Sequence, residues 1–343
     1  MEQILKHRAE IYGLLALWIM AFHLDRVCFA IPDNSLFVFA NFIKIGCAGV
    51  DVFLFLSGYC LYLSLNRNSN AANFFRKRFK RVVVVYLVIA IPFFIYKMAV
   101  ETRTNVVMNF FFDLSGLSFW LKNCQNAWFV HAIIAFYILT IPFYHIIRRG
   151  LVYGIALLIL LYVFNYVGYS YIPIYKEAAI AYTRIPAYLF GMVLADTYNR
   201  YPIEERFQGM TRFAKVLILI FLVGYLAAFL AFDARSAILA LFDSKGLWLS
   251  FITIILPILS LCLLIVKFFS KVDWIYSFLS IVGKVSLEFY LIHIMILHII
   301  RHFGLQSQIG AMSYLIIPIL TFPLSLGANK LSEKIIGKLA VKK

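Results

Sequence analysis

Residues 49–59 read GVDVFLFLSGY, and the apolar run continues as CLYLSL to residue 65. A run of about 17 residues with one carboxylate, Asp51, is long enough to cross a bilayer as a helix. Similar runs recur along the chain, which is 63% hydrophobic and only 14% charged. Soluble domains average about 25% charged residues. The pattern predicts an all-α fold, a polytopic transmembrane helix bundle that forms a single domain over residues 1–343.

Working outward from this run, we expect about ten spans. Their approximate bounds are 11–31, 45–65, 82–100, 127–147, 151–171, 177–196, 214–232, 246–266, 279–300 and 310–329. With the N-terminus in the cytoplasm, most of the 32 Lys and Arg residues lie in inner loops, as the positive-inside rule requires. An even number of spans then places both termini in the cytoplasm. This distribution explains the net charge of +16 without any nucleic acid partner.

Charged residues accompany the first spans. The first run begins after Arg8 and Glu10 and contains His23 toward its outer end, and the cluster RKRFKR occupies residues 76–81. A histidine inside a membrane usually lines a cavity or a reaction path. Arg78 and Arg81 are three residues apart and share a helix face, and paired guanidinium groups bind phosphate oxygens well. The pattern indicates chemistry inside a membrane on a donor that carries phosphates.

Two connections are long enough to matter. Residues 101–126 are expected to form an outer loop with aromatic groups at 110–112 and 119–120. Such a loop either lies in the membrane interface or folds as a lid over an outward-facing site. Residues 197–213 are mixed in charge, which predicts a solvated inner connector.

Further polar and aromatic side chains fall within the predicted spans, where each polar group needs a partner or a ligand. They are Asp51, Trp128, His131, Arg184, Glu288 and His293. Asp51 is expected either to orient His23 or to pair with an arginine. Arg184 has no neighbouring carboxylate in the sequence and is expected either to belong to a site or to form a structural ion pair. Glu288 and His293 are five residues apart, about 140° around a helix, and are not expected to act as one unit.

Metal binding and a disulfide framework are not expected. His298 and His302 are four residues apart, but no third metal ligand is evident. The five cysteines are odd in number and include no CxxC pair, so they indicate neither a zinc site nor a set of disulfides.

Six motifs, taken together, resemble the acyltransferase-3 family of integral membrane acyltransferases. They are RAE at 8–10 with FH at 22–23, GVDVFLFLSGY at 49–59, FRKRFKR at 75–81, WFV at 128–130 followed by Tyr137, RIP at 184–186 followed by Gly191, and GKVSLEFYLIH at 283–293. The family usually has an arginine about eleven residues before the histidine, where this chain has Tyr12. Either Arg8 takes that place from one turn earlier, or the arginine's role is lost.

The resemblance implies a multi-pass O-acyltransferase of the bacterial cytoplasmic membrane, without an SGNH-type esterase domain. It would transfer an acyl group, with acetyl expected, from acyl-coenzyme A (acetyl-coenzyme A) to a hydroxyl of an envelope polysaccharide or lipid-linked sugar. His23 would act as general base or acyl-accepting nucleophile, with Asp51 as its catalytic partner. The donor would be held by Arg78, Arg81, Arg8 and Glu10, and the substrate-facing residues would be Trp128, His131, Arg184, Glu288 and His293.

Two other function classes fit parts of the pattern. A transporter of a small polar solute could use the same buried His, Asp and Arg as a binding site or relay. However, the sequence has no repeat symmetry and no matched pair of broken spans, which are typical of many transporters. A scaffold in an envelope complex would not require His23 at all. The expected partners are the lipid bilayer, acyl-coenzyme A and a glycan or lipid-linked acceptor; the sequence leaves the oligomeric state open.

Overall fold

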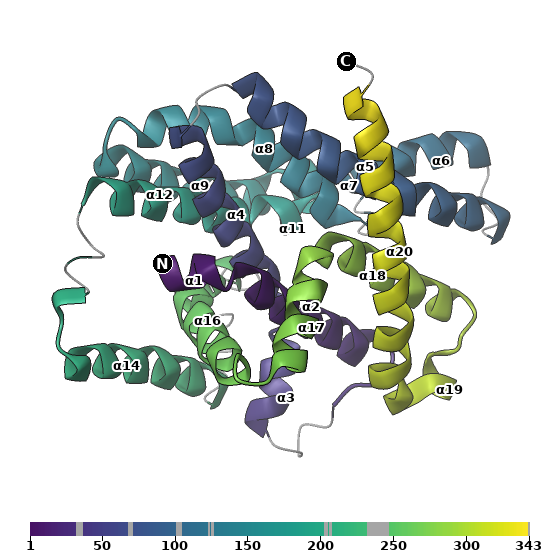
Figure 1. Cartoon of the computed structure of the whole chain (residues 1–343). Coiled ribbons are helices and arrows are strands. Elements are labelled where there is room, and N and C mark those ends of the chain that lie inside the picture. Colours follow the sequence, from purple (N-terminus) through teal and green to yellow (C-terminus); the bar gives the residue numbers. More distant parts are fainter. Residues whose placement is uncertain are drawn as a thin grey trace.

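The computed structural model describes residues 1–31, 37–67, 71–100, 105–122, 124, 127–201, 205, 208–231 and 247–341. Every regular element in these ranges is helical (Figure 1). The first part of the chain forms α1 (Glu2–Lys6), α2 (Arg8–Val27), α3 (Phe37–Lys44), α4 (Ala48–Arg67), α5 (Ala71–Val100), α6 (Val106–Leu114), α7 (Leu117–Lys122), α8 (Trp128–Ile147) and α9 (Leu151–Tyr171).

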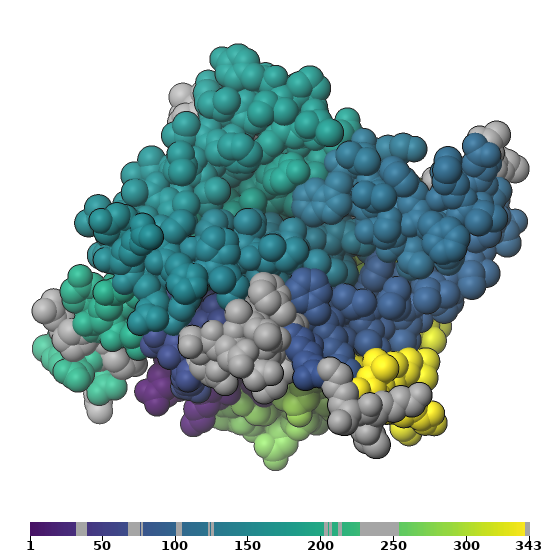
Figure 2. Space-filling model, turned by 90° about the horizontal axis from the view of Figure 1, so that it is seen from above, coloured from purple at the N-terminus to yellow at the C-terminus, as the bar shows by residue number. Residues whose placement is uncertain are grey.

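The second part of the chain continues the helical pattern. It forms α10 (Pro173–Glu177), α11 (Ala179–Tyr182), α12 (Ile185–Arg200), α14 (Arg212–Ala231), α16 (Leu247–Phe269), α17 (Asp273–Lys284), α18 (Ser286–His302), α19 (Gln306–Ile309), the 3₁₀ turn η2 (Gly310–Met312) and α20 (Ser313–Val341). In Figure 2 the teal segments around α8 to α12 make up much of the face seen from above, with yellow α20 at its edge.

Five helical stretches in the described part of the chain are long and apolar enough to cross a membrane. They are Ala48–Arg67, Arg78–Val100, Trp128–Ile147, Leu151–Tyr171 and Gln306–Leu339, and the bent pair α17–α18 makes a sixth if it counts as one span. The prediction of an all-helical, multi-pass membrane protein is therefore confirmed. The count of ten spans and the cytoplasmic position of both termini stay predictions.

The ninth span, predicted as one helix over residues 279–300, is wrong in its shape. The chain breaks at Val285, and α17 and α18 meet at a bend of 78°. The two helices have different neighbours, because α17 packs along α2 whereas α18 packs against α20 and α5 as well as α2. The bend places Lys284 and Ser286 at the corner between these two packing directions.

The sixth span, predicted over residues 177–196, is also interrupted. Short α10 and α11 precede α12, and Pro186 lies in the first turn of α12, where proline lacks no needed hydrogen bond. Arg184 occupies the N-cap position of this helix, at the interruption, without a side-chain capping hydrogen bond. The interruption therefore positions the one arginine of this predicted span.

Residues 101–126, predicted as a loop, contain two helices among their described residues. Lys97 Nζ bonds to Asp113 Oδ2 at 2.8 Å, and the Tyr86 hydroxyl donates to the carbonyl of Leu114 at 2.9 Å, which ties α6 to α5. Phe119 is fully buried, whereas Phe111 is 62% exposed. The segment therefore has one face on the bundle and one apolar outer face, as a helix at a membrane interface requires.

The core lies around α4, whose residues Leu54, Phe55 and Leu56 are fully buried. By contrast, α9 exposes apolar side chains such as Val152 and Leu160. Exposed apolar residues along a whole helix are expected where lipid, not water, is the solvent. Helix α9 therefore forms part of the lipid-facing surface, and α4 the centre of the bundle.

Glycines set two close helix crossings. A Cβ at Gly283 of α17 would collide with the carbonyl of Ala9, and one at Gly13 of α2 with the carbonyl of Leu279. Gly58 of α4 and Gly191 of α12 meet their partner backbones in the same way. Small residues allow transmembrane helices to approach until their backbones touch. The α2–α17 and α4–α12 pairs thus form the tightest contacts of the bundle.

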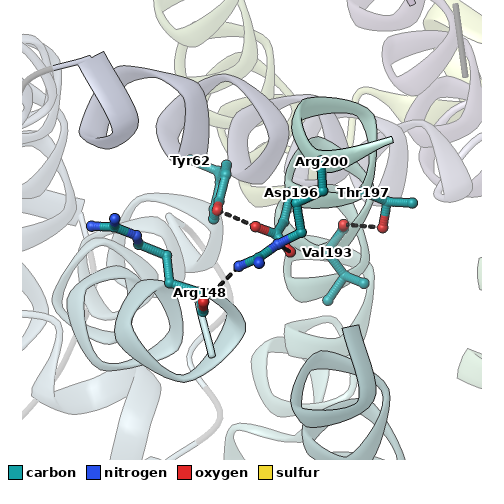
Figure 3. Close-up of polar contacts among 6 residues, drawn as sticks. All are labelled: Tyr62, Arg148, Val193, Asp196, Thr197 and Arg200. Atoms are coloured by element: carbon teal, nitrogen blue, oxygen red, sulfur yellow. Dashed lines mark hydrogen bonds and ion pairs between the residues drawn. The ribbon is translucent and has the colours of Figure 1, made fainter. Parts of the chain in front are cut away.

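A buried polar network fastens α4, α8 and α12 at one end (Figure 3). Asp196, 1% exposed, accepts hydrogen bonds from the Tyr62 hydroxyl and from Arg200 Nε, the latter at 2.6 Å. Arg200 also donates to the carbonyl of Arg148 at 2.5 Å, and its hydrogen bond to Asp196 raises the pKa of Arg200. A buried carboxylate is tolerated only when it is paired and hydrogen-bonded, and this network meets both conditions.

Candidate active site

A cavity of about 310 Å³ opens between the helices of the bundle. Each of five long helices contributes one stripe of side chains to its wall. The stripes are Arg8, Tyr12, Ala16 and Ile19 of α2; Val50, Phe53, Ser57, Cys60 and Leu61 of α4; Arg78, Arg81 and Val82 of α5; Phe129, Ile133 and Tyr137 of α8; and Ser286, Leu287, Tyr290 and His293 of α18. Most are spaced by three or four residues, as on one helix face, so each of these helices presents one face to the cavity.

One end of the cavity is strongly basic. Arg8, Arg78, Arg81 and Lys284 all line it, and the Arg81 guanidinium donates to the carbonyl of Lys284 at 3.2 Å. The side chains of Arg78 and Arg81 are exposed. Four cations on three different helices, α2, α5 and α17, can surround an anionic group with charge-assisted hydrogen bonds. The two arginines predicted to share a face do so, and Lys284 joins them from the bend after α17.

Arg8 and Tyr12 occupy the place where the family's arginine is expected. Both line the cavity, with the Arg8 guanidinium 5.9 Å from the centre of the Tyr12 ring. Arg8 also donates a hydrogen bond to the sulfur of Cys60 at 3.4 Å, and Tyr12 stacks on Phe53 at 4.7 Å. The cavity therefore has a guanidinium one turn nearer its basic end than the family pattern predicts.

Glu10, expected beside Arg8 as a donor-binding residue, is not among the cavity-lining residues. It lies on another face of α2, is only 6% exposed, and bonds to the hydroxyl of Tyr276 in α17. Successive helical residues face different directions, which separates Glu10 from the stripe of Arg8 and Tyr12. The structure thus assigns Glu10 to the α2–α17 contact and not to the donor site.

The far end of the cavity leads to two histidines. His293 lines the cavity, and His23 follows Ile19 by four residues on the same stripe of α2. His23 Nδ1 lies 2.9 Å from His293 Nε2, and His293 Nδ1 lies 2.8 Å from the carbonyl oxygen of Phe289. The sequence contained both residues but no signal that they touch, because 270 positions separate them. The distance from Arg8 to His23 along α2 is about 22 Å at 1.5 Å per residue.

Asp51 does not orient His23. Its carboxylate lies 3.8 Å from Nε of Arg184, and the indole of Trp128 lies 5.2 Å from the same guanidinium. Asp51 instead pairs with an arginine, which is the other arrangement expected from the sequence. Asp51, Arg184 and Trp128 form a buried cluster that joins α4, α8 and the start of α12 but does not line the cavity. Because breaking a buried ion pair costs about 3–5 kcal/mol, this cluster has a clear structural role.

The remaining predicted substrate-facing residues lie away from the cavity wall. His131 is 9% exposed and packs between the rings of Tyr86 and Phe119. Glu288 is 1% exposed, with Arg81 and Glu333 as its charged neighbours. Of the five residues predicted to face the substrate, only His293 lines the cavity.

Sequence reasoning missed several lining residues that bear functional groups. Lys284, Tyr137, Tyr290 and Cys60 lie in quoted motifs or apolar runs but received no role. For Lys284 a signal existed, since a lysine at the inner end of a predicted span can face the same site as the basic cluster. The tyrosines had none, because an aromatic residue in a span more often fills the core.

Comparison with known proteins identifies the architecture. The family model described as an acyltransferase domain, Acyl_transf_3, matches residues 13–329 of the chain. The chain belongs to the acyltransferase-3 family. No curated protein and no solved structure matches it significantly.

The acyltransferase-3 match covers both histidines, the basic cluster and Lys284, but it begins after Arg8 and Tyr12. It supports a membrane acyltransferase in general and favours that reading over a solute transporter. The acyl donor, the acceptor and the residues that act on them are not given by the match.

Proposed function

We propose that this protein transfers an acyl group, with acetyl as the expected group, from acyl-coenzyme A to a hydroxyl of an envelope polysaccharide or lipid-linked sugar. One observation carries the proposal: a single cavity extends from four cations to His293, whose ring contacts His23, within a chain of the acyltransferase-3 family. The cations suit the phosphates of the donor, and the histidines suit proton transfer at its thioester.

The donor would enter from the basic end, which the positive-inside distribution places at the cytoplasmic face. Arg8, Arg78, Arg81 and Lys284 would hold its phosphate groups. The pantetheine arm would pass the apolar part of the wall, around Tyr12 and Phe53, toward His293. The surrounding helices would limit the access of water to the thioester and so slow its hydrolysis.

His23 would act as the general base. It is half-buried and does not line the cavity, so the acceptor would reach it from outside the donor cavity. His23 Nε2 takes the hydroxyl proton while the oxygen attacks the thioester carbon. The carbon–sulfur bond then breaks, and the departing thiolate takes the proton from His23, which restores the base and releases coenzyme A as its thiol.

The test is transferase activity of purified protein in detergent or nanodiscs, with acetyl-coenzyme A and a panel of envelope glycans. His23→Ala is expected to lower the rate by roughly 10²–10⁴-fold, since a general base contributes that much. More than about a tenth of the activity remaining in a folded His23→Ala protein would remove His23 from this role. A burst of released coenzyme A before steady state would indicate an acyl-histidine intermediate in place of direct transfer.

A further inference from the structure

We infer that His293 is a positioning residue that fixes the tautomer of His23 and leaves His23 Nε2 as the base. The inference rests on the proposed function and deepens it. Its basis is a chain of two hydrogen bonds that runs from the carbonyl of Phe289 through His293 to His23.

The proton positions follow from the end of this chain. A backbone carbonyl can only accept a hydrogen bond, so the nitrogen that faces Phe289, His293 Nδ1, carries a hydrogen. Phe289 lies one turn before His293 in the same helix, α18. The orientation of the His293 ring is therefore set within its own helix and does not depend on a bound substrate.

His293 is in its neutral form. It is 1% exposed, and its ring nitrogens bond to a carbonyl and to an imidazole in the described part of the chain, not to a carboxylate. A charge there without a counter-charge would be expensive. A neutral imidazole with hydrogen on Nδ1 has a lone pair on Nε2, so His293 Nε2 accepts and His23 Nδ1 donates.

This arrangement gives the two rings different tasks. Both nitrogens of His293 are occupied, so neither is available to a substrate. His23 has one occupied nitrogen, Nδ1, and its Nε2 has the lone pair that a base requires. When Nε2 takes a proton, the imidazolium keeps its hydrogen bond to His293 Nε2, which stabilises it as the third member of a catalytic triad does. Without His293, His23 could place its hydrogen on Nε2 and lose the base.

The test uses two substitutions that differ by one methylene. In His293→Asn the amide reaches only the position of Nδ1, so it can keep the bond to Phe289 but not the bond to His23. In His293→Gln the amide oxygen reaches the position of Nε2 and can accept from His23. We expect kcat to fall at least tenfold for His293→Asn, the order of effect for a residue that orients a reactive group. The Gln variant is expected to recover much of that loss, with the KM for acetyl-coenzyme A similar in both.

Equal kcat values for the two amide variants, or a loss confined to the donor KM, would overturn the inference and make His293 only part of the cavity wall. His293→Phe keeps the ring volume without polar atoms and replaces the amide variants if these impair folding. Near-wild-type activity of His293→Phe would also overturn the inference. The proposed function is tested separately, because full activity in His23→Ala would refute the base itself whatever the His293 variants do.

Discussion

At the scale of single residues, the site depends on a few polar side chains that an apolar bundle holds at fixed separations. Arginine keeps its charge and its two-pronged geometry at the cavity mouth, whereas lysine offers only a point charge. At the other end, Tyr290 and His293 line the cavity, and His293 bonds to His23. Substitutions that keep charge or volume can therefore separate binding from packing.

Arg78→Lys and Arg81→Lys are expected to raise the KM for acetyl-coenzyme A by roughly ten- to a hundredfold, because losing one charged hydrogen bond costs about 1.5–3 kcal/mol. Arg76→Lys is the matched control, since Arg76 is exposed on the same helix but does not line the cavity. Steady-state kinetics at varied donor concentration provide the measurement. Unchanged KM in both cavity variants would mean that the two arginines only anchor the helix at the inner face.

Tyr290→Phe is expected to lower kcat by roughly 100-fold, the loss typical of one oxyanion donor. The Tyr290 hydroxyl is buried and near the backbone of Phe129, and Tyr290 lines the cavity beside His293, with ring centres 5.8 Å apart. It can therefore donate to the oxygen of a thioester under attack. Tyr96→Phe is the control, because the Tyr96 hydroxyl is also buried but Tyr96 is not among the residues that line the cavity. Equal kcat in the two variants would exclude this role for Tyr290.

Cys60 offers a direct probe of donor binding. It lines the cavity and accepts a hydrogen bond from Arg8, so a bound donor is expected to shield it. In a variant that keeps Cys60 as its only cysteine, coenzyme A should slow labelling by a maleimide, and the same concentration of pantetheine, which lacks the phosphates, should slow it much less. Labelling that coenzyme A leaves unchanged would argue against donor binding in this cavity.

At the scale of elements, the site is set by helix pairs that touch through glycine. The α2–α17 contact at Gly13 and Gly283 fixes where Arg8 and Lys284 lie, and the bend after α17 directs α18 and His293 back toward α2. A helix pair with this spacing has no room for a methyl group. Packing at one crossing is thus coupled to the geometry at both ends of the cavity.

Gly283→Ala is expected to destabilise the protein by about 1–3 kcal/mol, as overpacking of a tight contact does, and to raise the donor KM by moving Lys284. Gly224→Ala in α14 is the control, because nothing lies within 4 Å of the added methyl group and alanine favours a helix over glycine by about 1 kcal/mol. Thermal unfolding in detergent, followed by intrinsic fluorescence, compares them. A Gly283→Ala protein as stable as the wild type would show that α2 and α17 are not held in this close contact.

At the scale of the whole molecule, the two ends of the cavity differ in the side chains that they present. Arg8 at the basic end and His23 lie at opposite ends of the same stripe on α2, so the proposed donor and acceptor would approach from different sides. If the positive-inside distribution gives the orientation, the donor comes from the cytoplasm and the product forms toward the outer face.

Single cysteines at positions 76 and 26 test this orientation, since both native side chains are exposed. Position 76 precedes Arg78 on α5, and position 26 follows His23 on α2. In a cysteine-free background, an impermeant reagent is expected to label position 26 in intact cells and position 76 only in inverted vesicles. The reverse pattern would invert the topology and with it the cytoplasmic entry of the donor. A variant with cysteine at Gly209, on the predicted inner connector, gives an independent reference.

The sequence by itself determined the fold class and the composition of the cavity mouth. Apolar runs of span length, interrupted by short basic loops, allow few structures besides a helical membrane bundle, because lipid cannot satisfy a free backbone group. Arg78 and Arg81 could be placed on one face because that relation depends only on the helical repeat. The family motifs extended this to an acyltransferase.

Only the tertiary structure decided which distant side chains meet. His23 contacts His293 and not Asp51. Asp51 pairs with Arg184, and Glu10 bonds to Tyr276. The two members of each pair lie on separate helices. Likewise, the residue at the centre of the bend, Val285, is neither proline nor glycine, so it gives no sequence signal for a bend. Such choices depend on how each helix is rotated and how closely its neighbours approach, and those follow from packing at glycines and core residues contributed by the whole chain.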